Sequence, residues 1–262
     1  IEYMTVPSIV LDSTPQPASP VAGVLLIHGL NGSLRDMAEI EEILRKNNCA
    51  TRNLLLPGHG SKVREMLPLG WPEWSAAVRA EFRMLKQQHE RVFVVGHSLG
   101  GALALHTAAH EEVAGVVSMC APLSMYPWMR PLIRVARHVA PLVPTIREDV
   151  RDREARRDYA RDVYRWTPMR PVESMLNYLP TLRKELPQIT APALIMVSRR
   201  DHVVPARDGR EIYHLIGSHE KHLVTFHHSY HVIMRDHDRA EVLAKTEAFI
   251  LRHACNLSRA PF

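Results

Sequence analysis

The chain has 262 residues, of which 46% are hydrophobic, enough for a sizeable core in one α/β domain with an insertion. Its formal net charge of +5 is not accompanied by a basic stretch interleaved with aromatic residues, so we expect no nucleic-acid partner. No apolar run approaches the roughly 20 residues of a membrane span, so we expect no stable insertion into a membrane.

The three cysteines bear on the compartment and on metal binding. Cys49, Cys120 and Cys255 are widely spaced, and they match neither a disulfide framework nor a metal-binding pattern. The first residues lack a basic segment followed by an apolar one, so we predict no signal peptide. These features favour a protein of the reducing cytoplasm, and we expect a monomer or a weak homodimer.

Apolar strands alternate with helical stretches along the chain. In chain order, strands are predicted at about 8–11, 23–27, 51–56, 92–95, 113–119, 193–197 and 221–226. Helices are predicted at about 39–47, 74–88 and 102–110, with another near Asp208 and one at the end of the chain. The alternation is typical of a parallel sheet with helices on both faces, whose functional side chains lie after the carboxyl ends of the strands.

The strand at 92–95 leads into Gly96-His97-Ser98-Leu99-Gly100, and a helix follows at once. This is a G-x-S-x-G motif in the strand–turn–helix setting of a nucleophilic serine. Gly96 and Gly100 lack the Cβ atoms that would clash in so tight a bend. The motif predicts Ser98 as a nucleophile, with the start of the helix favouring negative charge beside it.

Two backbone N–H groups are candidates for holding an oxyanion. The first belongs to Leu99, directly after the predicted nucleophile. The second comes from the glycine-bearing loop at 28–33, which follows an early strand, and we assign it to Leu30.

A serine nucleophile needs a base and an acid, and both follow later strands. Asp201 lies just past the strand at 193–197, and His231 lies in a short loop after the strand at 221–226. The order Ser98, Asp201, His231 is that of the α/β-hydrolases, distinct from the chymotrypsin and subtilisin orders.

Alternatives remain open for each partner. Asp208 could be the acid in place of Asp201. The alternative bases are the other histidines of the same region: His227, His228 and His237. Clustered histidines also bind zinc, so His227, His228 and His231 form a second, less favoured interpretation as a metal site.

Four stretches carry a resemblance to a known family: His28-Gly29-Leu30-Asn31-Gly32, Leu56-Pro57-Gly58-His59-Gly60, Gly96-His97-Ser98-Leu99-Gly100-Gly101 and Ser229-Tyr230-His231-Val232-Ile233. The chain resembles α/β-hydrolases of the bacterial carboxylesterase and monoacylglycerol lipase family, over nearly its whole length from Val24. The resemblance implies an α/β-hydrolase fold, with a mostly parallel central sheet, helices on both faces and a small inserted cap. It also implies ester substrates with a lipophilic acyl group.

The alternation of strands and helices stops between 122 and 187, a proline-rich segment with short helical stretches. In the family plan this is a cap after the sixth core strand, which leaves 1–121 and 188–262 as the hydrolase core. Its apolar residues either line a substrate tunnel or pack the cap on the core, and together they indicate an apolar acyl pocket. We assign substrate binding to Met125, Trp128, Met129 and Leu132.

The expected function is that of a serine carboxylesterase, which hydrolyses esters of lipophilic short-to-medium acyl chains through an acyl-enzyme on Ser98. Monoacylglycerols are one candidate substrate, and the reaction requires no cofactor and no metal. Arginine-rich composition of the cap and the extra histidines before His231 depart from the family and leave the preferred substrate open. The alternatives are a non-catalytic small-molecule receptor on the same fold, a thioesterase and a carbon–carbon bond hydrolase.

Overall fold

The computed structural model describes residues 20–255 except 125, 127 and 146–148. The strand predicted at 8–11 and the predicted substrate-binding residue Met125 lie outside the described residues. Within them, the main sheet has six strands in the order β2-β1-β3-β4-β7-β8. These strands are β1 (Gly23–Ile27), β2 (Ala50–Leu54), β3 (Val92–His97), β4 (Gly115–Met119), β7 (Ala193–Ser198) and β8 (Lys221–Phe226).

All neighbouring strands of this sheet are parallel, so their carboxyl ends lie along one edge. The register aligns Ile27 at the end of β1 with Gly96 near the end of β3, and Ser198 at the end of β7 with Phe226 at the end of β8. The loops that carry the predicted site residues therefore leave the sheet at the same edge, as the sequence predicts.

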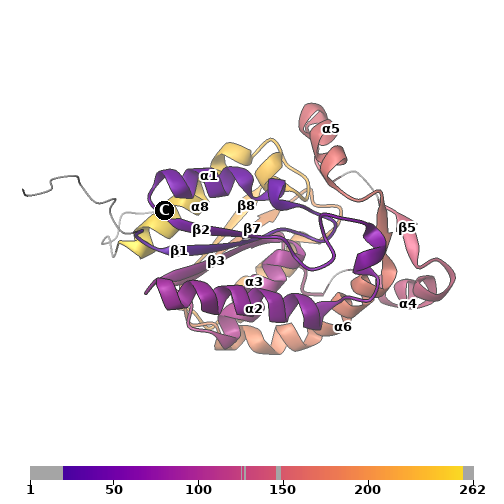
Figure 1. The fold of residues 1–262 in the computed structure, drawn as a ribbon, viewed down its shortest axis with the longest axis horizontal. Coiled ribbons are helices and arrows are strands. Elements are labelled where there is room, and N and C mark those ends of the chain that lie inside the picture. The colour runs from indigo at the N-terminus through magenta and orange to yellow at the C-terminus, as the bar shows by residue number, and fades with distance from the viewer. Residues whose placement is uncertain (1–19, 125, 127, 146–148, 256–262) are drawn as a thin grey trace, which may run out of the picture.

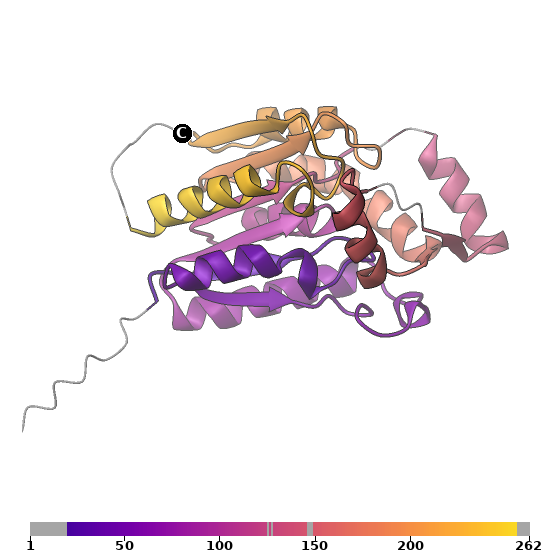
Figure 2. The ribbon, with the colours of Figure 1, turned by 90° about the horizontal axis from the view of Figure 1, so that it is seen from above.

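Helices cover both faces of the sheet (Figures 1 and 2). One face is covered by α1 (Ala38–Lys46) and α8 (Arg239–Ala254). The other is covered by α2 (Trp71–Gln88), α3 (Leu99–His110), α6 (Met169–Glu185) and α7 (Ala206–Leu215). The architecture is that of an α/β-hydrolase fold, as predicted.

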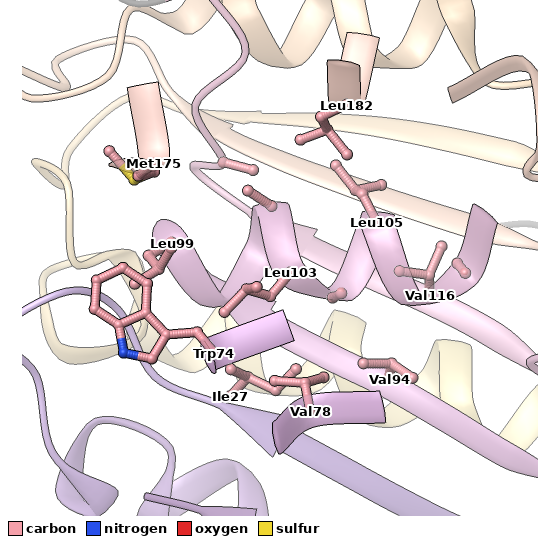
Figure 3. Packing of buried hydrophobic residues seen from close by; sticks show 14 of the residues in the cluster. Ile27, Trp74, Val78, Val94, Leu99, Leu103, Leu105, Val116, Met175 and Leu182 are labelled. Carbon is pink, nitrogen blue, oxygen red and sulfur yellow. The ribbon is translucent and has the colours of Figure 1, made fainter. Parts of the chain in front are cut away.

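The apolar strands explain why both faces need cover. In β1, Leu25 and Ile27 pack into the core on the α2 and α3 side, whereas Val24 and Leu26 pack under α1 and α8. All four side chains are fully buried. Figure 3 shows the core on the α2 and α3 side, where Trp74 of α2 and Leu103 of α3 lie close to Ile27. Alternation of side chains along a strand thus produces two separate cores from one continuous apolar run.

The segment 122–187 lies beyond the carboxyl ends of the strands and returns to the body of the protein through α6. It contains α4 (Met129–Val139), β5 (Leu142–Pro144), α5 (Arg153–Asp162) and β6 (Trp166–Pro168), with β5 and β6 paired antiparallel. Figures 1 and 2 show α4, α5 and β5 at the end of the molecule away from the chain's C-terminus. By contrast, Leu176, Leu179 and Leu182 of α6 pack in the core beneath the sheet. The division into a core and a cap at 122 and 187 stays a prediction.

One element boundary differs from the sequence-based expectation for a local reason. Helix α2 begins at Trp71, three residues before the predicted start at 74. The Gly70 N–H donates to Glu73 Oε2 at 2.8 Å, and Pro72 occupies the first turn, where its missing N–H costs nothing.

The remaining single turns are η1 (Leu34–Asp36), η2 (Val63–Met66), η3 (Leu186–Gln188) and η4 (Ile233–Arg235). Across the part of the chain that the structure describes, none of the helices has the length and apolarity needed to cross a bilayer.

Candidate active site

Ser98 occupies the turn between β3 and α3, with a φ of 54° and a ψ of −119°. A non-glycine residue rarely adopts a positive φ, so this backbone is strained and must be held by its surroundings. The Ser98 N–H donates to the Met119 carbonyl at 2.8 Å. A Cβ at Gly96 would overlap the Gly100 carbonyl, and one at Gly100 would overlap that of Ile27. The two glycines therefore permit the strained turn that the motif predicts.

His231 and Asp201 meet Ser98 at the edge of the sheet. His231 Nε2 lies 2.9 Å from Ser98 Oγ, and His231 Nδ1 lies 2.7 Å from Asp201 Oδ2. The side chains of His231 and Asp201 are 6% and 1% exposed. Three side chains that are far apart in the sequence thus form one continuous hydrogen-bonded chain at the ends of β3, β7 and β8.

The Asp201 carboxylate is fixed on both oxygens. Its Oδ1 accepts hydrogen bonds from the N–H groups of Val203 and Val204 at 2.7 and 2.8 Å, which leaves Oδ2 directed at His231. The Cys120 thiol also contacts this carboxylate, and burial together with the Asp201 charge raises the pKa of the thiol well above its ordinary value. Cys120 therefore stays protonated and can donate to Asp201.

Asp201 also sets the charge state of His231. Burial alone would lower the pKa of His231, but the charge of Asp201 and its hydrogen bond raise the pKa above 6.5. A hydrogen bond from Nδ1–H to the carboxylate leaves Nε2 as the acceptor that faces the Ser98 hydroxyl. The pair is thus arranged for proton transfer from serine to histidine.

The loop around His231 is anchored by two further side chains. The His97 Nε2–H donates to the His231 carbonyl at 3.1 Å, and burial keeps the pKa of His97 well below 6.5. Asp236, which is 5% exposed, accepts backbone hydrogen bonds from Tyr230 at 2.8 Å and from Arg151 at 2.7 Å. These contacts restrict the rotation and translation of the imidazole.

The alternative acid lies elsewhere. Asp208 is fully buried near the start of α7, where its carboxylate accepts hydrogen bonds from the N–H groups of Leu123 and Ser124 at 2.8 and 2.9 Å, and from the Ser124 hydroxyl at 2.7 Å. These contacts tie the chain after β4 to α7 and direct the carboxylate at backbone donors.

The alternative bases lie outside the hydrogen-bonded chain of Ser98, His231 and Asp201. His227 and His228 are exposed, and His237 Nδ1 is 4.0 Å from Asp152 Oδ2. Three-residue groups able to ligate a metal occur at Cys120, Asp201 and His231, and at His106, His110 and Glu185. The less favoured interpretation of 227, 228 and 231 as a zinc site does not correspond to either of these groups.

The two candidate oxyanion donors flank Ser98. Leu99 is the first residue of α3, where a helix leaves its N–H groups without intrahelical partners. A Cβ on Gly29 would lie 3.2 Å from Ser98 Cβ, so the 28–31 loop passes directly over the serine. Leu30 is the next residue. The roles of Leu30 and Leu99 stay predictions.

The loop that carries Leu30 is held by the segment 122–187. Asn31, with a φ of 62°, donates from Nδ2 to Thr167 Oγ1 at 2.7 Å, and Thr167 Oγ1 lies 2.9 Å from Thr145 Oγ1. Thr145 and Thr167 come from the β5–β6 region, so these strands contact the predicted oxyanion loop.

The predicted substrate-binding residues in and directly before α4 have different environments. Trp128 and Leu132 are 62% and 57% exposed. Met129 is partly buried and packs against the core cluster that contains Leu99. Figure 3 shows Leu99 of this cluster beside Met175 of α6. Their roles in substrate binding stay predictions.

Sequence reasoning missed Cys120, Asp236 and Thr167. Each acts through a contact with a residue more than five positions away, and none belongs to a recognisable motif. The only local signal was the position of Cys120 directly after a predicted strand, where side chains reach the edge that carries the site.

Comparison with known proteins identifies the family of the chain. The family Hydrolase_4, described as serine aminopeptidase, S33, matches residues 18–238. The chain belongs to this family. This hydrolase is 30% identical over 233 residues to the thermostable monoacylglycerol lipase of Bacillus sp. (strain H-257), covering 88% of this chain and 91% of that protein. It is 25% identical over 237 residues to a carboxylesterase of Bacillus subtilis (strain 168), covering 86% and 92%.

Solved structures show the same fold for this hydrolase. A structure from a study of two metagenome-derived lipolytic enzymes has a TM-score of 0.81 and 31% identity, covering 90% of this chain and 95% of that one. The monoacylglycerol lipase of Paleococcus ferrophilus has a TM-score of 0.75 at 22% identity, covering 90% and 96%. The second likeness bears on the fold alone.

Proposed function

We propose that this protein is a serine carboxylic ester hydrolase with Ser98 as nucleophile, His231 as general base and acid, and Asp201 as the orienting acid. The observation that carries the proposal is the continuous chain of hydrogen bonds, 2.9 Å from Ser98 to His231 and 2.7 Å from His231 to Asp201. The family and the names of the relatives, monoacylglycerol lipase and carboxylesterase, support the same reaction class.

In the first half of the reaction, Ser98 Oγ attacks the ester carbonyl carbon and its proton passes to His231 Nε2. The negative charge that develops on the carbonyl oxygen is held by the N–H groups of Leu30 and Leu99. One such donor can contribute roughly 10²–10³ in rate. Collapse of the tetrahedral intermediate breaks the bond to the alcohol, which leaves with the proton from His231.

In the second half, water replaces the alcohol. His231 takes a proton from the water as it attacks the acyl-enzyme, and the same oxyanion site holds the second tetrahedral intermediate. The carboxylic acid leaves as the proton returns to Ser98 Oγ. Throughout, the Asp201 charge stabilises the imidazolium form, in agreement with the raised pKa of His231.

The proposed substrates are esters of lipophilic short-to-medium acyl chains, including monoacylglycerols. Support comes from the apolar side chains near the nucleophile: Leu99 belongs to the buried cluster against which Met129 and Leu30 pack. Apolar walls with a few polar groups are typical of sites for such ligands. A cytoplasmic location and a monomeric or weakly dimeric state complete the proposal, and the free thiols of Cys49, Cys120 and Cys255 agree with a reducing compartment.

The test is a substrate series with wild-type protein and Ser98→Ala. p-Nitrophenyl esters of increasing acyl length and a series of monoacylglycerols are the proposed substrates, and aminoacyl p-nitroanilides are the counter-substrates, because the family description names an aminopeptidase. We expect many turnovers on the esters, and a loss on the order of 10⁶ in kcat in Ser98→Ala.

Two outcomes would contradict the proposal. Retention of more than about a tenth of the ester turnover in Ser98→Ala would remove Ser98 from the mechanism. A single slow turnover with tight ligand binding would indicate a receptor, and faster cleavage of the anilides than of every ester would indicate a peptidase.

A further inference from the structure

A second cluster of ligating side chains lies between α3 and α6, on the face of the sheet that α2 also covers. His106 and His110 are four residues apart on α3, so their side chains project from the same side of the helix. Glu185, the last residue of α6, lies opposite them. Figure 3 shows Leu105 of α3 beside Leu182 of α6 in the packed core. Two helices that are distant in sequence therefore bring two imidazoles and one carboxylate together.

The spacing of the donor atoms matches a metal site. His106 Nδ1 lies 2.9 Å from Glu185 Oε2, and His110 Nε2 lies 3.2 Å from Glu185 Oε1, with the three ligating groups within 4.8 Å of one another. Zinc–ligand bonds of about 2.0–2.1 Å in a tetrahedron place neighbouring ligand atoms about 3.3 Å apart. Small side-chain adjustments would therefore place all three atoms around one ion.

The surroundings favour a cation. The side chains of His106 and Glu185 are 8% and 9% exposed, whereas that of His110 is 35% exposed and opens the cluster to solvent. The Tyr178 hydroxyl donates to Glu185 Oε1 at 2.7 Å and can shift toward a fourth ligand position. The nearby Arg79 is paired with Glu111 at 2.9 Å, which offsets its positive charge.

We propose that His106, His110 and Glu185 form a binding site for a divalent transition-metal ion of the Zn²⁺ type, with water or the Tyr178 hydroxyl as fourth ligand. Binding requires the proton of each neutral imidazole to sit on the nitrogen that faces away from the ion. The ion would connect α3, which begins directly after Ser98, to α6, which follows the β5–β6 region. Its role is to stabilise this seam, and it takes no part in ester chemistry.

The test is calorimetric titration of the full-length, chelator-treated protein with ZnCl₂, together with thermal unfolding. We expect one Zn²⁺ per chain, and a rise in Tm of about 5–10 °C at a free concentration 100 times the dissociation constant. His110→Gln is the main variant, since this partly exposed side chain can change without disturbing the core. It should weaken binding at least about tenfold and reduce the rise in Tm at the same free Zn²⁺ concentration to about half or less.

Controls locate the ion. His214→Gln, at an exposed histidine on α7, and His231→Gln, which removes the ligand shared with Cys120 and Asp201, should both bind Zn²⁺ like wild type. Glu185→Gln should weaken binding and change the visible absorption spectrum of bound Co²⁺. If Glu185 had a structural role without binding the metal, its replacement would leave this spectrum unchanged. Lack of binding by wild type, or binding that survives both His110→Gln and Glu185→Gln, would overturn the proposal.

Discussion

At the scale of single residues, the site depends on how few positions Asp201 and His231 can adopt. Asp201 Oδ1 is occupied by two backbone N–H groups, and the thiol of Cys120 lies against the same carboxylate. His231 is held through its carbonyl by His97 as well as through Nδ1 by Asp201. A histidine held at its backbone and at Nδ1 keeps Nε2 directed at Ser98 Oγ, which is the geometry that general-base catalysis requires.

Exchange of each candidate acid for its amide separates their roles. Asp201→Asn should lower kcat by about 10⁴, because the amide stabilises the wrong tautomer of His231. Asp208→Asn should lower kcat less than tenfold, and should instead lower the Tm, since its carboxylate holds the backbone of Leu123 and Ser124. Steady-state kinetics and thermal unfolding of the two variants give both readouts. A larger loss of kcat in Asp208→Asn than in Asp201→Asn would reverse the assignment.

Residues of the site were predictable from the sequence where a strand, a turn and a motif coincide. Ser98 follows from G-x-S-x-G after an apolar strand, and Asp201 and His231 follow from their places after two later strands. The sequence distinguishes Asp201 from Asp208 less clearly, because both residues come after β7. Only the hydrogen bonds of Asp208 to the chain after β4 show why its carboxylate is directed away from His231.

At the scale of elements, the predicted oxyanion loop is connected to the segment 122–187. The side chain of Asn31 reaches Thr167 in β6, and Thr167 reaches Thr145, directly after β5. On the other side of the site, Arg235 Nη1 of η4 lies 2.9 Å from Asp162 at the end of α5 and 3.3 Å from Asp36 of η1. The loops that carry Leu30 and His231 are thus both supported by this segment.

Removal of the Thr167 hydroxyl tests the first of these connections. Thr167→Val should lower kcat about tenfold with little change in KM, because the loop of Leu30 loses the hydrogen bond from Asn31 and the oxyanion donor moves. Thr145→Val is the matched control, since it leaves the bond between Asn31 and Thr167 in place. Kinetics on one p-nitrophenyl ester measure both variants. Equal kcat values for the two variants would show that the connection does not reach the oxyanion site.

The core elements follow from local sequence, whereas the contacts of 122–187 do not. Continuous apolar runs predicted β1, β3 and β7, because a strand buried on both faces needs apolar side chains throughout. Arg235 pairs with Asp36, which is 199 residues away, and with Asp162, which is 73 residues away. Charges at such separations carry no periodicity, so their meeting had to be read from the structure.

At the scale of the whole molecule, buried neutral histidines link stability to pH. Burial lowers the pKa of His28 to about 3, with the charge of His59 as a further cause, and burial lowers the pKa of His59 to about 4. In the unfolded chain each histidine titrates near 6.5. Between these values the unfolded state binds protons that the native state does not, so the stabilisation is complete above pH 6.5 and declines as the pH falls.

The free energy of unfolding should therefore decrease from pH 7 to pH 5, by up to about 1.4 kcal/mol per pH unit for each such histidine. Urea unfolding at several pH values measures the slope. His59→Gln should reduce the slope of the free energy of unfolding against pH by the contribution of one histidine. This reduction is expected whatever the effect of the substitution on stability at pH 7. His214→Gln, at an exposed position on α7, is the control. An unchanged slope in His59→Gln would mean that His59 is not held neutral in the fold.

The central claim concerns the reactivity of one hydroxyl group at the edge of the sheet, so its most direct test is covalent labelling. Wild-type protein should react once per chain with a p-nitrophenyl alkylphosphonate, lose its esterase activity in proportion, and carry the label on Ser98 in peptide mass spectrometry. His231→Ala should label far more slowly. A label on any other residue, or full esterase activity after Ser98 is modified, would contradict the account.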